Sequence, residues 1–305
     1  MIVMLLMCSL FAGRAQGQLH LSVNPPEISG VFDALYKYDL VEAENKFNRI
    51  SSATIDPGLM ELTQVNLYWW WMISGDESRD YDFLMTSVLK KTIGRLRMKP
   101  IERMTSDEVF FMIHSYAYLT RVDIFFNRYL KGIANLKQTL VFLKVALQQA
   151  DRYDKYLLVS GLYHYFARVA MSKYPFLVPF FTGAPAASRE LGYLQLSRCA
   201  EMKNILIRNE ARYYLMKINY QLEDDFERSL KIADQLIAAY PNNLVYRYHR
   251  FTILLDSGRK KQALEEYQWL VLASATAPGL NKEQRIHFTD IALKQLRKQR
   301  VNPAI

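Results

Sequence analysis

The sequence contains few residues that break a chain or cross-link it. Its 305 residues include 2 cysteines, 12 glycines and 10 prolines. So few chain breakers, with no clusters of β-turn residues, favour long helices joined by short connections. Two cysteines also exclude a disulfide-rich scaffold, so the stability of the fold must come from an apolar core.

Familiar catalytic and metal-binding patterns are also missing. The sequence has no G-x-G-x-x-G, no P-loop and no G-x-S-x-G. None of its histidines has the spacing that places two metal ligands on one helix face. These histidines are His20, His114, His164, His249 and His287. We therefore expect no enzymatic activity, no catalytic residue, no metal and no cofactor. An envelope enzyme whose acids and histidines meet only in the fold is an alternative, which a deep pocket with convergent, shifted ionisable groups would favour.

The formal net charge of +9 comes from basic residues spread along the chain. Such a distribution is typical of a solvated surface, and it would also attract an acidic protein or a lipid surface. No nucleic-acid-binding motif accompanies it, so we expect no nucleic-acid partner.

The first residues have the pattern of a signal peptide. An apolar run from Ile2 to Ala12 is too short to cross a bilayer and is followed by small residues at Ala15 and Gly17. This pattern predicts a signal peptide over residues 1–17 and export to the periplasm or cell envelope. Cleavage after Ala15, a buried amino-terminal helix and lipidation at Cys8 are the alternatives. After cleavage Cys199 is the sole thiol, expected as a small buried residue.

A repeat of 34 residues is visible in the last third of the chain, in two units that span 210–243 and 244–277. Equivalent residues in the second helices of the two units are Ser229 and Ala263, Leu230 and Leu264, and Leu236 and Leu270. The small residues Ser229 and Ala263 suit the close crossing of two helices. Gly258 suits the tight turn between helices, and Pro241 ends the first unit.

These residues carry a family resemblance. Tyr213, Tyr220, Ser229 and Pro241 match the tetratricopeptide-repeat pattern in the first unit, and Gly258, Ala263 and Tyr267 match it in the second. The chain resembles exported bacterial members of the tetratricopeptide-repeat family. The resemblance implies a right-handed α-solenoid of helix pairs with a concave surface for a protein or peptide. Arg247 and Arg250 depart from the pattern, since large apolar residues are usual there.

Helical periodicity continues over the rest of the chain. We expect helix pairs at 31–38 with 40–50, at 59–74 with 81–97, and at 155–173 with 187–201. Two long, irregular middle helices begin at the capping box of Thr105 with Glu108 and near Leu136. Asn281 with Gln284 caps a terminal helix over 281–300. With no linker rich in Gly, Ser or Pro, we predict one all-α, tetratricopeptide-like domain over 18–302.

Two aromatic runs and one insertion are unusual. Tyr68 to Trp71 and Tyr163 to Phe166 each predict either a helix buried on most sides or an aromatic platform for a ligand. The insertion at 174–185 carries Phe176, Phe180 and Phe181. It is a loop folded onto the solenoid, a partner-binding knob or a shallow membrane anchor, so a peripheral membrane contact is the alternative function.

The resemblance also places a binding surface. It puts Tyr214 and Tyr248, 34 residues apart, at equivalent inward-facing positions of first helices, with Arg212 and Arg247 nearby. Aromatic rings beside guanidinium groups suit a peptide with carboxylates. The sequence therefore predicts a non-enzymatic scaffold protein of the cell envelope with a concave groove for a protein or peptide. The alternative at these positions is that the tyrosines pack against neighbouring repeats.

Overall fold

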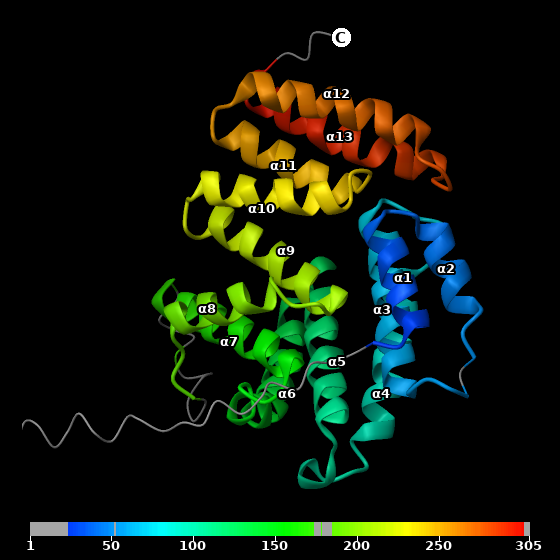
Figure 1. Ribbon diagram of the computed structural model, residues 1–305, viewed down its shortest axis with the longest axis vertical. Helices are drawn as coiled ribbons and strands as arrows, with labels where there is room; N and C mark the ends of the chain where they lie inside the picture. Colours follow the sequence, from blue (N-terminus) through cyan, green and yellow to red (C-terminus); the bar gives the residue numbers. More distant parts are fainter. Residues whose placement is uncertain (1–23, 52, 174–177, 179–184, 302–305) are drawn as a thin grey trace, which may run out of the picture.

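A computed structural model describes residues 24–51, 53–173, 178 and 185–301. Within these residues the protein has thirteen α-helices, one short 3-10 helix and no strand, which confirms the all-α prediction (Figure 1). The predicted signal peptide 1–17 and the three phenylalanines of the insertion, Phe176, Phe180 and Phe181, lie outside the described residues.

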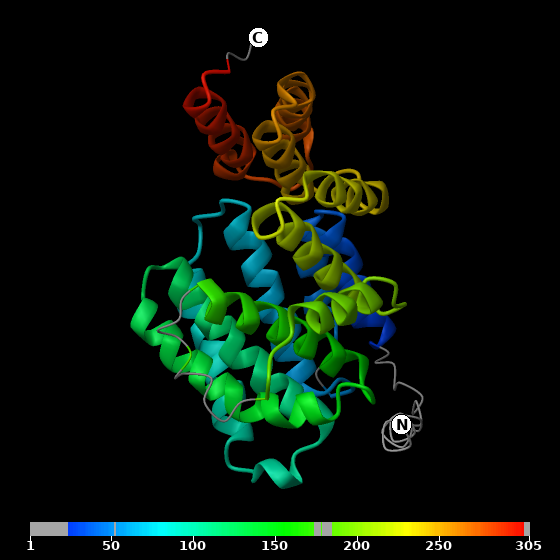
Figure 2. The same ribbon diagram turned by 90° about the vertical axis from the view of Figure 1, so that its left-hand side faces the viewer.

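Short connections join the helices. In chain order they are α1 (Pro26–Tyr36), α2 (Leu40–Asn48), α3 (Pro57–Ile73), α4 (Tyr81–Leu96), α5 (Ser106–Phe125), α6 (Tyr129–Gln148), α7 (Asp154–Lys173), α8 (Arg189–Cys199), α9 (Ile205–Gln221), α10 (Phe226–Ala239), α11 (Leu244–Asp256), α12 (Lys260–Thr276) and α13 (Lys282–Lys298). The helices pack mainly against their chain neighbours as six consecutive pairs, and α13 covers the last pair. The long middle helices α5 and α6, left unpaired in the sequence analysis, pack against each other (Figure 2).

Side-chain caps fix many of the helix starts. Thr105 with Glu108 and Asn281 with Gln284 both form the predicted capping boxes. Helix α6 instead begins seven residues before the expected Leu136. Its first residue follows Arg128, which makes no side-chain cap, so the local sequence gives no start signal there.

The two carboxy-terminal pairs cross through small residues, as predicted. Ser229 and Ala263 are fully buried, and the Ser229 hydroxyl donates to the Met216 carbonyl at 2.8 Å. Gly258 has a φ of +78°, a left-handed conformation that glycine adopts without strain. Cys199 is also fully buried, in agreement with the prediction.

The first aromatic run belongs to the core. The side chains of Trp69, Trp70 and Trp71 are only 6–8% exposed, so this run is a buried helix face rather than a ligand platform. The Trp70 ring lies 5.9 Å from Tyr36 and 6.3 Å from Tyr246, and Tyr36 lies 5.6 Å from Tyr240. We call these four residues the filled junction. Edge-to-face contacts at such distances stabilise beyond the area that the rings bury.

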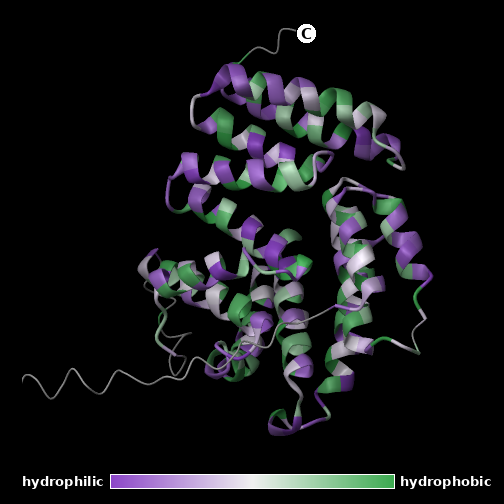
Figure 3. Cartoon of the chain, viewed as in Figure 1, coloured by the Kyte–Doolittle hydropathy of each residue, from purple (hydrophilic) through white to green (hydrophobic). Residues whose placement is uncertain are grey.

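Hydrogen bonds link segments more than 200 residues apart. The Asn243 side-chain amide donates to the Tyr36 carbonyl at 2.8 Å. The Gln284 and Asn281 amides donate to Ser74 at 2.7 Å and Asp76 at 2.6 Å. These contacts tie α1 and the turn after α3 to α11 and α13, so the chain does not pack through nearest neighbours alone. Each helix carries hydrophobic as well as hydrophilic residues, as the apolar core requires (Figure 3).

Candidate functional site

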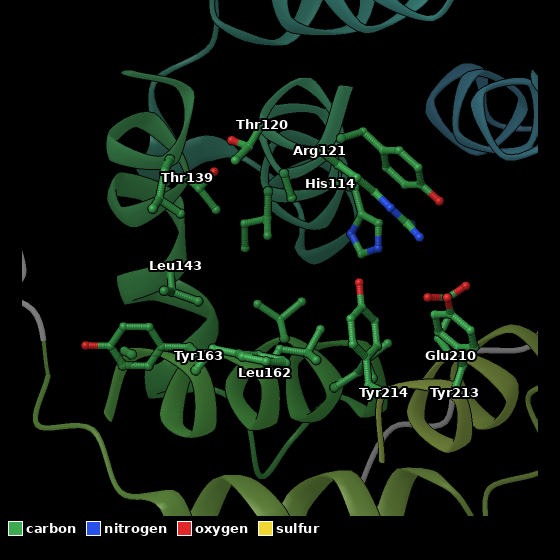
Figure 4. A pocket seen from close by; sticks show the side chains of 18 of the residues that line it. His114, Thr120, Arg121, Thr139, Leu143, Leu162, Tyr163, Glu210, Tyr213 and Tyr214 are labelled. Atoms are coloured by element: carbon green, nitrogen blue, oxygen red, sulfur yellow. The ribbon is translucent and has the colours of Figure 1, made fainter. Parts of the chain in front are cut away.

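Helices α3, α5, α6, α7 and α9 enclose a cavity of about 660 Å³ (Figure 4). Sites for small molecules occupy roughly 300–1,000 Å³ and are mostly apolar with a few convergent polar groups. Four of the five helices are first members of their pairs, so the cavity lies on the side that the first helices share. We call it the α5–α9 cavity.

Apolar side chains form most of its wall. On α6 these are Leu136, Leu140 and Leu143, and on α7 they are Leu158, Leu162 and Phe166. Spacings of three and four residues place each set on one face of its helix. Three large apolar side chains of the lining are exposed at the mouth, Ile124 at 50%, Leu136 at 42% and Phe166 at 37%. The cavity therefore has an apolar rim.

Charged and polar groups gather at the end of the cavity where α5 faces α9. Arg121 and His114 extend from α5, and Glu210 and Tyr214 extend toward them from α9 (Figure 4). Lys217 lies one turn beyond Tyr214 on the same helix and lines the cavity as well. This polar end brings two basic groups and one acid together inside the protein.

The two basic groups contact aromatic rings. The Arg121 guanidinium lies 3.8 Å above the Trp69 ring and 5.7 Å from the Tyr118 ring. The Lys217 ammonium lies 5.7 Å from the Tyr213 ring. Neither forms a salt bridge within the described part of the chain. Cation–π contacts hold both charges in place, and these contacts themselves use no N–H group.

Burial shifts the pKa of each ionisable group at the polar end. Desolvation raises the pKa of the Glu210 carboxyl, and the charge of Arg121 opposes that shift. Desolvation and the proximity of Arg121 lower the pKa of Lys217. Burial lowers the pKa of His114 to about 4, so its ring is neutral at pH 7, and its Nδ1 has no hydrogen-bond partner in the structure.

A second neutral histidine lies behind this end. The Tyr213 hydroxyl and His249 Nε2 share a hydrogen bond of 3.0 Å. Burial lowers the pKa of His249 to about 3 and raises the pKa of Tyr213 to about 12. Both groups are therefore uncharged at neutral pH, and the pair anchors the Tyr213 ring beside Lys217.

The structure separates the two predicted tyrosines. Tyr214 is half-buried, lines the α5–α9 cavity and contacts Phe166 at 6.1 Å between ring centroids. Tyr248 is also half-buried but lies against Phe288 at 5.7 Å, and its hydroxyl accepts a 2.6 Å hydrogen bond from Gln295. Of the pair, only Tyr214 belongs to the cavity.

The two predicted arginines bind their own chain. Arg212 donates to the Ala200 carbonyl at 2.9 Å. Arg247 forms a 3.2 Å salt bridge with Glu266 and stacks 4.0 Å above the Trp269 ring. Neither guanidinium lines the cavity, so the structure does not bring the four predicted groove residues Arg212, Tyr214, Arg247 and Tyr248 into one pocket.

The second aromatic run divides between core and cavity. Tyr165 is fully buried, whereas Tyr163 and Phe166 line the cavity. The Tyr163 hydroxyl donates to the Pro185 carbonyl at 2.6 Å, which holds the end of the insertion at the cavity wall. This run is therefore both a buried helix face and part of a pocket.

The sequence analysis missed Arg121, Glu210 and Lys217. A signal was present on α9, because Glu210, Tyr213, Tyr214 and Lys217 occupy positions i, i+3, i+4 and i+7 of one helix face. Charged residues at both ends of an inward-facing stripe indicate a lined pocket rather than a packed core.

No family model, curated protein or solved structure matches this chain. Over the described residues, no group of three or more His, Cys, Asp or Glu side chains is placed to hold a metal ion. Of the helices in the described ranges, none combines the length and the apolar character needed to cross a bilayer.

Proposed function

We propose that this chain is a non-enzymatic binding protein of the cell envelope, in which helix pairs of the tetratricopeptide type wind as a right-handed α-solenoid around the α5–α9 cavity. The proposal rests on one observation: a cavity of about 660 Å³ whose wall is apolar and whose inner end carries charged groups without salt bridges. Such a combination is characteristic of ligand sites. The protein or peptide partner expected from the sequence, and a peripheral membrane contact through 174–185, stay predictions.

The position of the cavity supports this function. Helical-repeat proteins bind along the surface formed by one helix of each repeat. The cavity opens between α3, α5, α7 and α9, the first helices of four successive pairs, and Tyr214 lines it.

Filling the cavity tests the proposal. Ala117 lines the cavity near its exposed side, so Ala117→Trp places a large ring in the space that a ligand would occupy. Ala134 is exposed on α6 and does not line the cavity, so Ala134→Trp is the matched control. Native mass spectrometry of protein isolated from envelope extract should detect a bound molecule on the wild type and on Ala134→Trp, but not on Ala117→Trp. Equal occupancy of all three proteins, or none on the wild type, would reject the cavity as the binding site.

The envelope location has its own test. Amino-terminal sequencing of the protein from its native host should give a chain that begins near Gln18, because the small residues at Ala15 and Gly17 mark a cleavage site. Recovery of an intact Met1 terminus from the soluble cytoplasm would refute export.

An enzyme is the second candidate function, because the cavity brings together ionisable groups with shifted pKa values. Glu210, with its raised pKa, has the property that a general acid or base requires. The two functions differ in the fate of the bound molecule. A binding protein releases it unchanged, whereas an enzyme converts it and Glu210→Gln stops the conversion. Mass spectrometry of the molecule before and after prolonged incubation distinguishes the two functions.

A further inference from the structure

We propose that the α5–α9 cavity binds a single-chain aliphatic carboxylate, with its head group between Arg121 and Lys217 and its chain along the α6 and α7 walls. This inference rests on the proposed function and names the chemical class of its ligand. Charge balance, donor geometry, cavity size and the apolar rim each support it.

The charges of the residues at the polar end favour a ligand with one negative charge. Among the described lining residues, Arg121 and Lys217 are the bases and Glu210 is the acid. Two cations against one carboxylate give a formal net charge of +1 in a partly desolvated site, which is costly unless a counter-charge enters. A monoanion supplies that counter-charge, whereas a cationic ligand would add to the excess.

The donors at the polar end suit a carboxylate. The Arg121 guanidinium is planar, and its fork matches the two oxygens of a carboxylate. Stacking on Trp69 fixes its orientation without using its N–H groups. The Tyr214 hydroxyl lies at the same end (Figure 4). A head group placed there receives donors from α5 and from α9.

The size of the cavity suits one acyl chain. A water molecule occupies ~30 Å³ in the liquid, and a methylene group is of similar size, so 660 Å³ holds on the order of 20 such groups. That space accommodates a head group with a chain of roughly 12 to 18 carbons.

The apolar rim provides a route by which the acyl chain of the ligand can enter the cavity. Ile124, Leu136 and Phe166 are exposed apolar residues at the mouth, on three different helices. Apolar side chains at a surface mark contacts with apolar molecules. They give an acyl chain an apolar path into the cavity from a micelle or membrane, while its carboxylate binds at the polar end.

Calorimetric titration tests the assignment. The whole chain, freed of co-purified lipid, is titrated with hexadecanoate, hexadecanol and acetate at neutral pH. Hexadecanoate should bind, hexadecanol should bind on the order of 10-fold more weakly because it lacks the charge, and acetate should not bind detectably because it lacks the chain. Lys217→Met removes the ammonium with little change of shape and should weaken hexadecanoate on the order of 10-fold without affecting hexadecanol. Lys144→Met, at an exposed position on α6 outside the cavity, is the matched control and should change neither affinity.

The outcomes separate this inference from the proposed function. Equal affinities for hexadecanoate and hexadecanol would overturn the head-group assignment. If neither hexadecanoate nor hexadecanol binds, the ligand class is wrong. It is also wrong if only an acidic peptide displaces the natural ligand from the protein. In both cases the proposed function still stands if Ala117→Trp removes the native ligand. The proposed function fails if the wild type carries no molecule in that experiment.

Discussion

Two aromatic-rich regions of the inner face differ in how completely their side chains fill the space between helices. In the filled junction, Tyr36, Trp70, Tyr240 and Tyr246 contact one another ring to ring. In the α5–α9 cavity, Phe166, Tyr213 and Tyr214 line an open space. The difference follows from where the large residues lie. At the filled junction each ring contacts two others, whereas at the cavity Phe166 and Tyr214 contact each other and also line an open space beside aliphatic and charged side chains.

Truncation at the two regions gives the largest expected contrast. Trp70→Ala should lower the free energy of unfolding by about 3–5 kcal/mol, because it empties a closely packed site. Leu162→Ala, in the cavity wall, should cost only about 1–2 kcal/mol, because one side of Leu162 already faces open space. Urea denaturation followed by circular dichroism measures both. Equal losses would show that the cavity is as tightly packed as the filled junction.

Acid should weaken the polar end of the cavity. The folded-state pKa values of His114 and His249, about 4 and about 3, lie below the unfolded value of ~6.5, so the folded state binds fewer protons. Their contribution to stability is complete above pH 6.5 and is lost as the pH falls, by about 2 kcal/mol per ring at pH 5. Glu210, whose pKa is raised, has the opposite effect and becomes stabilising as the pH falls.

Urea denaturation midpoints between pH 7 and pH 5 measure how steeply the stability changes with pH. The double variant His114→Leu, His249→Gln should be less pH-dependent than the wild type, whatever its stability at pH 7. An unchanged slope would show that these two rings do not titrate on unfolding and that the polar end is not desolvated.

Enlarging an alanine should give a smaller difference in stability between a closely packed helix crossing and the cavity. Ala263→Leu should lower the free energy of unfolding by about 1–3 kcal/mol, because Ala263 is fully buried where α11 and α12 cross. Ala117 lines the cavity, so Ala117→Leu places its larger side chain there and should change the free energy of unfolding by no more than about 0.5 kcal/mol. Thermal melts compare both with the surface control Lys260→Ala. Tolerance at Ala263 would mean that the repeat register is wrong.

The smallest expected effect concerns the bond between α1 and α11. Asn243→Ala removes the donor to the Tyr36 carbonyl and the acceptor for the Tyr246 N–H, and should cost about 1–2 kcal/mol. Asn243→Asp keeps the acceptor and loses the donor, so it isolates the link to Tyr36. If Asn243→Asp is as stable as the wild type in urea denaturation, that link contributes nothing to the filled junction.

Local signals predicted much of this fold. The capping boxes at Thr105 and Asn281, the small residues Ser229 and Ala263 and the turn at Gly258 all determine structure through neighbouring residues. The start of α6 was missed because no capping side chain precedes it. The aromatic run at Trp69 to Trp71 could not be assigned from sequence, because its burial depends on rings contributed by α1, α5 and α11.

The candidate site was predictable only in part. The placement of Tyr214 follows from the repeat pattern, but Tyr248 has the same position in the next unit and is covered by Phe288 of α13. The repeat period shows which positions of two units are equivalent, but it does not show which other helix packs over a given position. Arg121 could not be connected to Glu210 by sequence, since the two residues lie on helices that meet only in the fold.

The hydrogen bonds from Asn243, Asn281 and Gln284 have a consequence for the order of folding. They join residues separated by 207, 205 and 210 positions, so they raise the contact order of a chain whose other helices pair locally. During synthesis α1 and α3 leave the ribosome long before their partners in α11 and α13 exist. Until then the rings of Tyr36 and Trp70 lack part of their packing. The amino-terminal half therefore cannot complete its core before α11 and α13 are present.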